Sequence, residues 1–292
     1  MKTTPLLLLR GLLMALAMLA TAVHGNAGTL IDFTGSASLS AKNALFNQNF
    51  YRTYGTSTEF TNRTDAGIRA DASLRGIYGF SRTDPEGPYG PANTGYLDES
   101  LIVRFVSPGT LSTSSGGIGL YTRIRPEDNL GIYGLVRITG TNSVVMTLRF
   151  GADSGENSTT SNTGTVFFNQ TLTPTLSLST GTSYVMRLDQ TAGPDPAFTL
   201  SLFNESGTLL ATSGGIALSS VATPEQVLLY SGPGAIGIHY YAGSHAPRLS
   251  QIEIIPEPHL GWLMLGAGAF FLLLHRRRRP MGRRGISDLT GF

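Results

Sequence analysis

The chain has 292 residues, no cysteine and a formal net charge of +2 at neutral pH. Without cysteine, disulfide bonds and thiolate chemistry are excluded. Residues 28–255 carry 13 Lys and Arg residues against 17 Asp and Glu residues. This stretch is therefore mildly acidic, and no basic patch predicts nucleic-acid binding.

The first 27 residues have the pattern of a signal peptide. Lys2 and Arg10 are the only charges, the rest is largely apolar, and Gly25-Asn26-Ala27 matches the small-x-small pattern of a signal-peptidase site. We predict export through the Sec translocon and cleavage by signal peptidase after Ala27, with Ala22 as the second choice. The alternative is an uncleaved membrane anchor.

Residues 28–255 have the alternating pattern of antiparallel strands with one polar face. In the run 143–150, for example, Val144, Met146 and Leu148 alternate with Thr147 and Arg149. About a dozen such runs separated by turn residues predict a single extracytoplasmic domain, an all-β antiparallel sandwich of the jelly-roll or concanavalin A-like kind. The other clear runs are 101–105, 183–189, 197–203, 236–240 and 252–254.

Turn residues separate these runs, and almost no helical periodicity is present. Asn204-Glu205-Ser206-Gly207 predicts a four-residue hairpin loop that leads into a strand at 208–212. The apolar run 227–230 precedes Gly232-Pro233-Gly234 and is interpreted as a further strand before the one at 236–240.

Two glycine-rich segments in the middle of the domain carry a resemblance. They are Gly117-Ile118-Gly119-Leu120-Tyr121 and Gly131-Ile132-Tyr133-Gly134-Leu135. They resemble the middle of concanavalin A-like (laminin G-like) sandwiches. This resemblance implies the fold class and does not specify a ligand.

The candidate binding residues are aromatic or acidic. Tyr51, Tyr54 and Tyr240 are candidate glycan contacts, because sugars stack on aromatic faces beside polar groups. The alternative, which we favour, places them in the core or at its rim. Asp153 and Glu156 are a weak calcium candidate because their oxygens are closely spaced, although a polar hairpin loop has the same composition. No other metal and no cofactor is predicted.

The sequence shows no recognisable catalytic motif. The clustered acidic motif Glu-x-Asp-x-x-Glu of concanavalin A-like glycosidases is absent, and so is a Gly-x-Ser-x-Gly elbow. His239 and His245 have no metal-ligand spacing, and we expect them to be partly exposed near a loop. On these grounds the chain is expected not to be an enzyme.

The C-terminus has three parts in a fixed order. Pro256-Glu257-Pro258 is followed by an uncharged apolar run over 260–274 and then by four arginines, Arg276, Arg277, Arg278 and Arg279. An apolar helix of about 15 residues spans roughly 23 Å, which membrane thinning and snorkelling arginines can extend to a full crossing. The arginines then stay on the cytoplasmic side, as does the polar tail 280–292.

This arrangement over 256–279 resembles the PEP-CTERM sorting signal. The resemblance implies that an exosortase recognises Pro256, Glu257 and Pro258 and removes the tail, and that the host is a Gram-negative bacterium that makes an exopolysaccharide. In this chain His259 follows the motif, where Ser or Thr is common, and 13 residues follow the arginines. An ordinary single-pass anchor that is never cut is the alternative.

Together these features predict an exported protein, anchored transiently in the inner membrane and then released to the periplasm, cell surface or extracellular matrix. The predicted role is structural or adhesive, in the envelope and its exopolysaccharide. The alternatives are a lectin-like carbohydrate-binding module and, ranked last, a polysaccharide hydrolase.

Overall fold

The computed structural model describes residues 28–55, 60–70, 75–80, 99–108, 116–125, 130–139, 143–152, 164–171, 178–191, 193–241 and 247–255. Contacts divide the chain into two units, and every described residue lies in the compact unit Ala27–Pro256. The predicted signal peptide 1–27, sorting segment 256–279 and tail 280–292 lie outside the described residues and stay predictions. Among the described residues, no helix is long and apolar enough to cross a membrane.

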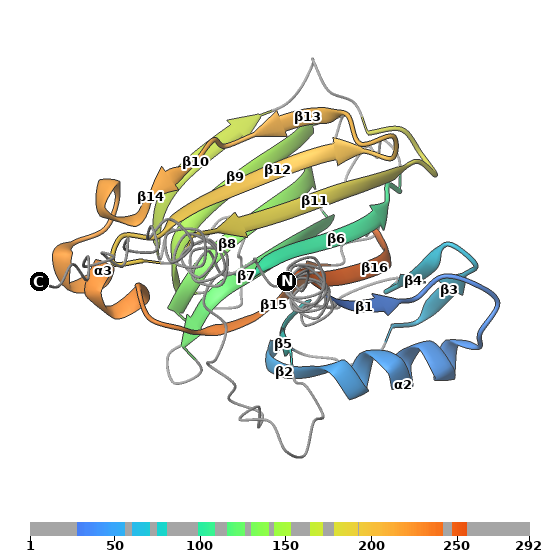
Figure 1. Ribbon diagram of the computed structural model, residues 1–292. Helices are drawn as coiled ribbons and strands as arrows, with labels where there is room; N and C mark the ends of the chain where they lie inside the picture. The colour runs from blue at the N-terminus through green and yellow to red at the C-terminus, as the bar shows by residue number, and fades with distance from the viewer. Residues whose placement is uncertain are drawn as a thin grey trace, which may run out of the picture. The chain divides into compact units, whose positions relative to one another are not determined.

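Sheet A has nine strands within the described residues, and each pairing in it is antiparallel. Its main path runs β13-β12-β11-β6-β16-β4-β3, while β1 pairs with β16 and β14 pairs with β12 (Figure 1). The strands are β1 (Thr29–Asp32), β3 (Asn62–Thr64), β4 (Gly67–Arg69), β6 (Ser100–Val106), β11 (Ser183–Gln190), β12 (Ala197–Asn204), β13 (Leu209–Thr212), β14 (Ile216–Ala217) and β16 (Arg248–Ile255).

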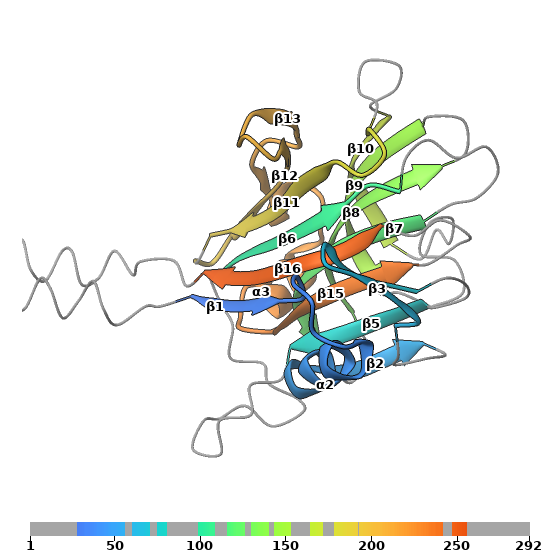
Figure 2. The same ribbon diagram turned by 90° about the vertical axis from the view of Figure 1, so that its right-hand side faces the viewer.

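Sheet B lies behind sheet A in Figure 1 and has seven strands within the described residues, again antiparallel. Its order is β10-β9-β8-β7-β15-β5-β2, and Figure 2 shows the two layers from the side. The strands are β2 (Phe50–Gly55), β5 (Arg75–Phe80), β7 (Gly116–Arg125), β8 (Leu130–Thr139), β9 (Ser143–Ala152), β10 (Gly164–Thr171) and β15 (Ala235–Tyr241).

The predicted fold class, an antiparallel β-sandwich, is confirmed, and the core follows the predicted alternation. In β11 buried and partly exposed residues alternate without a break, with Tyr184, Met186 and Leu188 buried. In β9 the buried apolar residues are Val144, Met146, Leu148 and Phe150. Residues of both sheets belong to one continuous cluster of buried side chains, so burial between the sheets is the main stabilising contribution.

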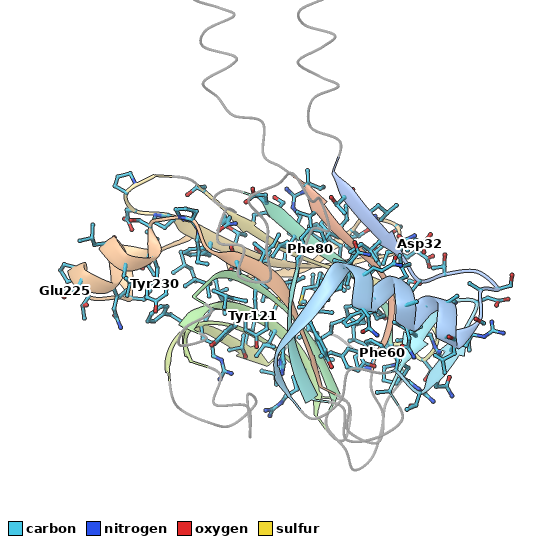
Figure 3. The ribbon with its side chains drawn as sticks, turned by 90° about the horizontal axis from the view of Figure 1, so that it is seen from below. Asp32, Phe60, Phe80, Tyr121, Glu225 and Tyr230 are labelled. Atoms are coloured by element: carbon cyan, nitrogen blue, oxygen red, sulfur yellow. The ribbon has the colours of Figure 1, made fainter. Side chains whose placement is uncertain are left out.

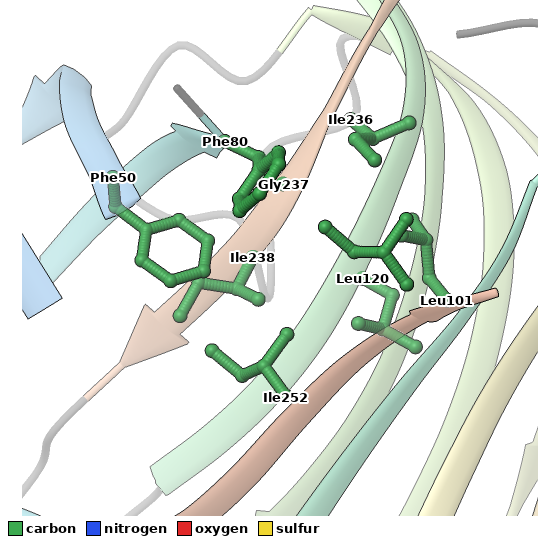
Figure 4. Close-up of a pocket in the computed structure, with 9 residues that line it drawn as sticks. Phe50, Phe80, Leu101, Leu120, Ile236, Gly237, Ile238 and Ile252 are labelled. Atoms are coloured by element: carbon green, nitrogen blue, oxygen red, sulfur yellow. The ribbon is translucent and has the colours of Figure 1, made fainter. Parts of the chain in front are cut away.

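A narrow apolar gap, too small to admit a water molecule, remains between the sheets. Figure 4 shows aliphatic and phenyl side chains directed toward one another around it. Its lining is hydrocarbon throughout, so we interpret it as imperfect core packing and not as a ligand site. It is lined by Phe50, Phe80, Leu101, Leu120, Ile236, Gly237, Ile238, Ile252 and Ile254.

The predicted hairpin at Asn204–Gly207 is present. The Gly207 amide donates to the Asn204 carbonyl, and the Thr208 amide donates to the Asn204 side-chain oxygen. Gly207 has a φ of 82°, which glycine adopts without strain. The loop joins β12 to β13, as the turn residues indicated.

The prediction of a strand at 227–230 is wrong, because these residues belong to helix α3 (Pro224–Tyr230). Thr223 and Gln226 form a reciprocal capping box, and Pro224 occupies the first turn, where its missing N–H costs nothing. A 3-10 turn, η1 (Leu218–Ser220), precedes it. Figure 3 shows Glu225 and Tyr230 of α3 at one end of the sandwich.

A second helix, α2 (Leu39–Asn49), lies at the other end and was also not predicted. Ser38 caps its first turn by accepting from the Ala41 amide. The helix buries only Lys42 and Phe46, so its sequence carries almost no amphipathic pattern. Phe46 anchors it among aromatic rings whose centroids lie 4.8–6.0 Å away: Phe33, Phe50, Phe60 and Tyr78.

Lys42 fixes α2 to the hairpin of β3 and β4. Its side chain is 2% exposed, and its ammonium group donates to the carbonyl oxygens of Gly35 at 2.7 Å and Thr64 at 2.9 Å. Burial lowers the pKa of Lys42, and the charges of Arg63 and Arg248 lower it further.

This lowered pKa gives the stability of the domain a pH dependence. Between the lowered value and the ordinary value of 10.5, the unfolded chain binds more protons at Lys42 than the folded chain does. The free energy of unfolding therefore rises with pH through that window. We expect the urea midpoint of the unit Ala27–Pro256 to rise less steeply with pH in Lys42→Met than in the parent. Equal slopes in the two proteins would contradict this role of Lys42.

Arg123 links the two sheets at the end of β7 near α3. It is 1% exposed and has a φ of 57°. Its guanidinium donates to Gln190 Oε1 on β11 at 2.8 Å and to the carbonyl oxygens of Ser231 at 2.7 Å and Gly232 at 2.6 Å. Gln190 Oε1 also accepts from the Thr122 hydroxyl at 2.7 Å. One side chain thus connects sheet B to sheet A and to the segment after α3.

Candidate functional site

The outer face of sheet B carries several aromatic and basic side chains. On β8, Ile132 and Val136 point into the core, so Tyr133, Leu135 and Arg137 point to the opposite face. Strand pairing aligns Arg149 of β9 with Tyr133, and Tyr133 with Tyr121 of β7. In the next row, Thr147, Leu135, Gly119 and His239 follow one another across the same four strands, β9, β8, β7 and β15.

Four of these side chains are in sequential contact, and we refer to Arg149, Tyr133, Tyr121 and His239 as the outer-face cluster. The Arg149 guanidinium carbon lies over the Tyr133 ring, 5.4 Å from its centroid, in cation–π contact. The rings of Tyr133 and Tyr121 meet edge to face at 4.4 Å, and those of Tyr121 and His239 at 5.9 Å. Figure 3 shows Tyr121 between the two ends of the sandwich.

The outer-face cluster is largely buried even though it points away from the inter-sheet core. Tyr121 and Tyr133 are 1% exposed, His239 is 4% exposed and Arg149 is 9% exposed. Beside them, Val145, Thr147 and Arg137 are partly exposed. The two tyrosines therefore form a rigid support. The partly exposed polar side chains of this face are Arg137 and Thr147, and Arg149 keeps a small exposed fraction next to Thr147.

Glycines shape this face. A Cβ atom at Gly119 would lie 2.4 Å from Leu135 Cδ2 and 3.2 Å from His239 Cβ. Glycine at 119 therefore allows both neighbours to approach β7 closely. Gly134 points the other way, since a Cβ atom there would lie 2.6 Å from Leu200 of sheet A. The two glycine-rich segments singled out in the sequence thus form the paired central strands of the candidate site.

The chemistry available here is recognition by charge and hydrogen bonding. Guanidinium groups donate in a planar fork that matches carboxylates and paired hydroxyls. Among the described residues, no group of three His, Asp or Glu side chains could hold a metal ion. The weak calcium candidate Asp153 and Glu156 lies outside the described residues and stays a prediction.

The predicted glycan contacts have different outcomes. Tyr240 is fully buried in the core, and its hydroxyl donates to the Pro247 carbonyl at 2.6 Å and accepts from the Ala70 amide. A side chain with no exposed area cannot stack on a sugar, so the glycan contact predicted at Tyr240 is wrong and the alternative, packing in the core, is confirmed there. Burial also raises the pKa of its phenol. Tyr51 and Tyr54 belong to β2 at the edge of sheet B, and their side chains lie outside those described.

His239 was expected to be partly exposed near a loop, and this is also wrong. It lies within β15, pairs with Gly119 and is buried against Tyr121. His245 lies outside the described residues. Arg149 and Tyr133 were missed as site residues, although Arg149 stood on the polar side of a correctly predicted strand. What the sequence alone lacks is the strand order that places Arg149, Tyr133 and Tyr121 in one row.

No protein-family model matches this chain, and a comparison with curated proteins finds no match either. Solved structures with a similar fold are found at low identity. The Crh5 transglycosylase is 12% identical, with a TM-score of 0.45 over 79% of this chain and 84% of its own. A legume lectin-like domain from Entamoeba histolytica is 8% identical, with a TM-score of 0.42 over 76% and 95%. The alginate lyase Aly36B is 14% identical, with a TM-score of 0.41 over 78% and 94%.

These neighbours correct one expectation. The chain was expected not to be an enzyme because a recognisable acidic motif is absent, yet a transglycosylase and a lyase are among the proteins of similar fold. The missing motif therefore does not exclude catalysis. Two pairs of acidic residues are adjacent in the sequence, Asp98-Glu99 and Glu127-Asp128. Of these four residues, Asp98, Glu127 and Asp128 lie outside the described residues.

Proposed function

We propose that this protein is an exported surface protein whose β-sandwich binds carbohydrate on the outer face of sheet B. The observation that carries the proposal is the outer-face cluster, in which Tyr133 holds the Arg149 guanidinium, with the partly exposed Thr147 and Arg137 farther along the same face. Sugar sites combine a rigid apolar support with a few fixed polar groups. The proposal gives the adhesive role expected from the sequence a molecular basis, namely attachment to matrix polysaccharide.

A blocking substitution tests this assignment. Thr147 is partly exposed in the middle of the face, so Thr147→Phe places a ring where the ligand would lie. We expect the affinity of the unit Ala27–Pro256 for its polysaccharide to fall by about tenfold or more, as when a central contact of an interface is lost. Binding is measured by calorimetry and affinity electrophoresis against a panel of neutral and acidic polysaccharides, and release of reducing ends is followed in parallel to detect turnover.

The matched control is Val185→Phe. Val185 is partly exposed on β11, a central strand of sheet A, and points away from the core. We expect Val185→Phe to leave binding unchanged. Equal loss in both variants, or loss in Val185→Phe alone, would place the site elsewhere on the domain.

The sorting part of the proposal rests on Pro256-Glu257-Pro258, the apolar run and the arginines that follow. We expect the intact mass of the mature protein to end near Pro256 in a host that carries an exosortase, and the tail to remain when the exosortase gene is deleted. Replacing Pro256, Glu257 and Pro258 by alanine should also retain the tail. A tail that extends to Phe292 in every strain would leave a simply anchored protein.

A further inference from the structure

The charges of the domain are divided unevenly between its parts. The seven described strands of sheet B contain six arginines and one histidine, and no Asp or Glu. The 17 acidic residues of the stretch 28–255 all belong to sheet A, to the helices or to the connecting segments. A mildly acidic domain thus contains one sheet without any acidic residue. The arginines are Arg52, Arg75, Arg123, Arg125, Arg137 and Arg149.

Two of these arginines belong to the outer face, and Arg137 is more exposed than Arg149. Arg149 is held over the Tyr133 ring, which fixes the direction of its guanidinium. Arg137 is on the neighbouring strand β8, is partly exposed and pairs with Val145. Arg123, by contrast, turns inward to Gln190 and contributes nothing to this face.

The spacing of Arg137 and Arg149 favours a polymer over a small anion. Arg137 is level with Val145, four residues from Arg149 along β9, which corresponds to about 13 Å. Side chains on strands stand roughly perpendicular to the sheet, so the two guanidinium groups do not converge on one carboxylate. A ligand that carries negative charges at regular intervals can contact both arginines at once.

The burial of the tyrosine rings next to Arg149 favours a polysaccharide over a nucleic acid. Single-stranded nucleic acids bind through bases that stack on exposed aromatic faces. The rings of Tyr121 and Tyr133 are 1% exposed and offer no such face. Arginine pairs in bidentate fashion with the planar carboxylate of a uronic acid, and the Thr147 hydroxyl can hydrogen-bond the sugar between two such groups.

From these observations we infer that the outer face of sheet B binds an acidic polysaccharide built from uronic acids. Arg137 and Arg149 pair with carboxylates of different sugars along one chain, and Tyr133 is a positioning residue for Arg149. The inference rests on the proposed carbohydrate-binding function and adds the chemical class of the ligand.

The test compares a polyuronate with the same polymer after chemical reduction of its carboxyl groups. The unit Ala27–Pro256 is titrated with polygalacturonate, alginate, the two carboxyl-reduced polymers, a neutral glucan and single-stranded DNA. We expect one of the polyuronates to bind, its carboxyl-reduced form to bind about tenfold more weakly or worse, and the affinity to fall with rising salt.

Arginine variants then show which residues bind the carboxylates of the polyuronate. Arg149→Gln and Arg137→Gln should each weaken polyuronate binding by about tenfold, while Arg104→Gln should not. Arg104 is a fitting control because it is partly exposed on the outer face of sheet A. The thermal unfolding of each variant is measured first. Arg137 is the more exposed of the two site arginines, so we expect its substitution to disturb the fold less. Arg137→Gln therefore keeps the test valid if Arg149→Gln is unstable. Tyr133→Phe should retain binding and Tyr133→Leu should reduce it.

The possible failures are distinguishable. Equal binding to the polyuronate and its reduced form would overturn the acidic ligand and leave carbohydrate binding intact. Tighter binding to DNA than to any polyuronate would overturn the choice of ligand class. Binding to none of the polymers would overturn the proposed function itself. Arg104→Gln with the largest loss would move the site to sheet A.

Discussion

Replacing Arg123 with alanine is expected to lower the free energy of unfolding by about 3–5 kcal/mol, as when one partner of a buried charged network is removed. The guanidinium donates to Gln190, Ser231 and Gly232, so the substitution leaves the carbonyl oxygens of Ser231 and Gly232 without this donor, while Gln190 Oε1 still accepts from the Thr122 hydroxyl. It also removes the Arg123 hydrogen bond from β7 to β11, while the hydrogen bond from Thr122 to Gln190 remains. The measurement is urea unfolding of the unit Ala27–Pro256.

The backbone at this position allows a sharper comparison. Arg123 has a φ of 57°, a conformation that costs L-residues roughly 1–2 kcal/mol and glycine nothing. Arg123→Gly loses the same hydrogen bonds as Arg123→Ala but not this cost. We therefore expect Arg123→Gly to be less destabilised than Arg123→Ala by about 1 kcal/mol. If Arg123→Ala were the more stable of the two, residue 123 would not have the left-handed backbone conformation in the folded protein.

Replacing Gly237 with alanine is the second change with a large expected effect. A Cβ atom there would lie 2.1 Å from the Tyr78 carbonyl oxygen and 3.0 Å from the Gly79 Cα atom, both on the backbone of β5. Backbone cannot move aside as a flexible side chain can, so strands β5 and β15 must separate locally. We expect a loss of about 3 kcal/mol in the free energy of unfolding.

Gly232→Ala provides the control for Gly237→Ala. A Cβ atom at Gly232 meets nothing within 4 Å, and its backbone is not in the left-handed region. We expect a change within about 1 kcal/mol, in either direction. Since Gly237 pairs with Tyr121, Gly237→Ala should also disturb the outer-face cluster and weaken carbohydrate binding. Comparable stability in the two variants would contradict the close approach of β5 and β15.

Strands were predictable because alternation in this chain is strong and local. Every residue of β11 follows the pattern of one buried and one partly exposed face, and such a pattern needs no knowledge of the partner strand. The two helices escaped prediction because neither has an apolar stripe. Helix α2 buries two residues, one of them the charged Lys42, and α3 leaves Leu228 and Leu229 exposed at 80% and 50%. The local evidence for them was the capping residues Ser38 and Thr223 and, for α3, Pro224 in the first turn.

The candidate site was less accessible to sequence reasoning, for a physical reason. Aromatic residues close together in sequence, such as Tyr51 and Tyr54, drew the prediction, whereas the outer-face cluster takes one residue from each of four strands. Its members are separated by up to 118 positions, between Tyr121 and His239, and only the sheet order aligns them. Conversely, residues adjacent in the sequence can lie on opposite faces. Tyr240 follows His239, but the alternation of side chains along β15 places Tyr240 in the core. The absence of acidic residues from the described strands of sheet B likewise becomes visible only once the strands are assigned to sheets.

The most direct test of the carbohydrate-binding assignment is a crystal structure of the unit Ala27–Pro256 with an acidic oligosaccharide. We predict that the sugar lies across β8 and β9 on the outer face of sheet B, with carboxylate oxygens within about 3 Å of the Arg137 and Arg149 guanidinium nitrogens. An oligosaccharide bound to the outer face of sheet A, or to a connecting segment with both arginines untouched, would contradict the account.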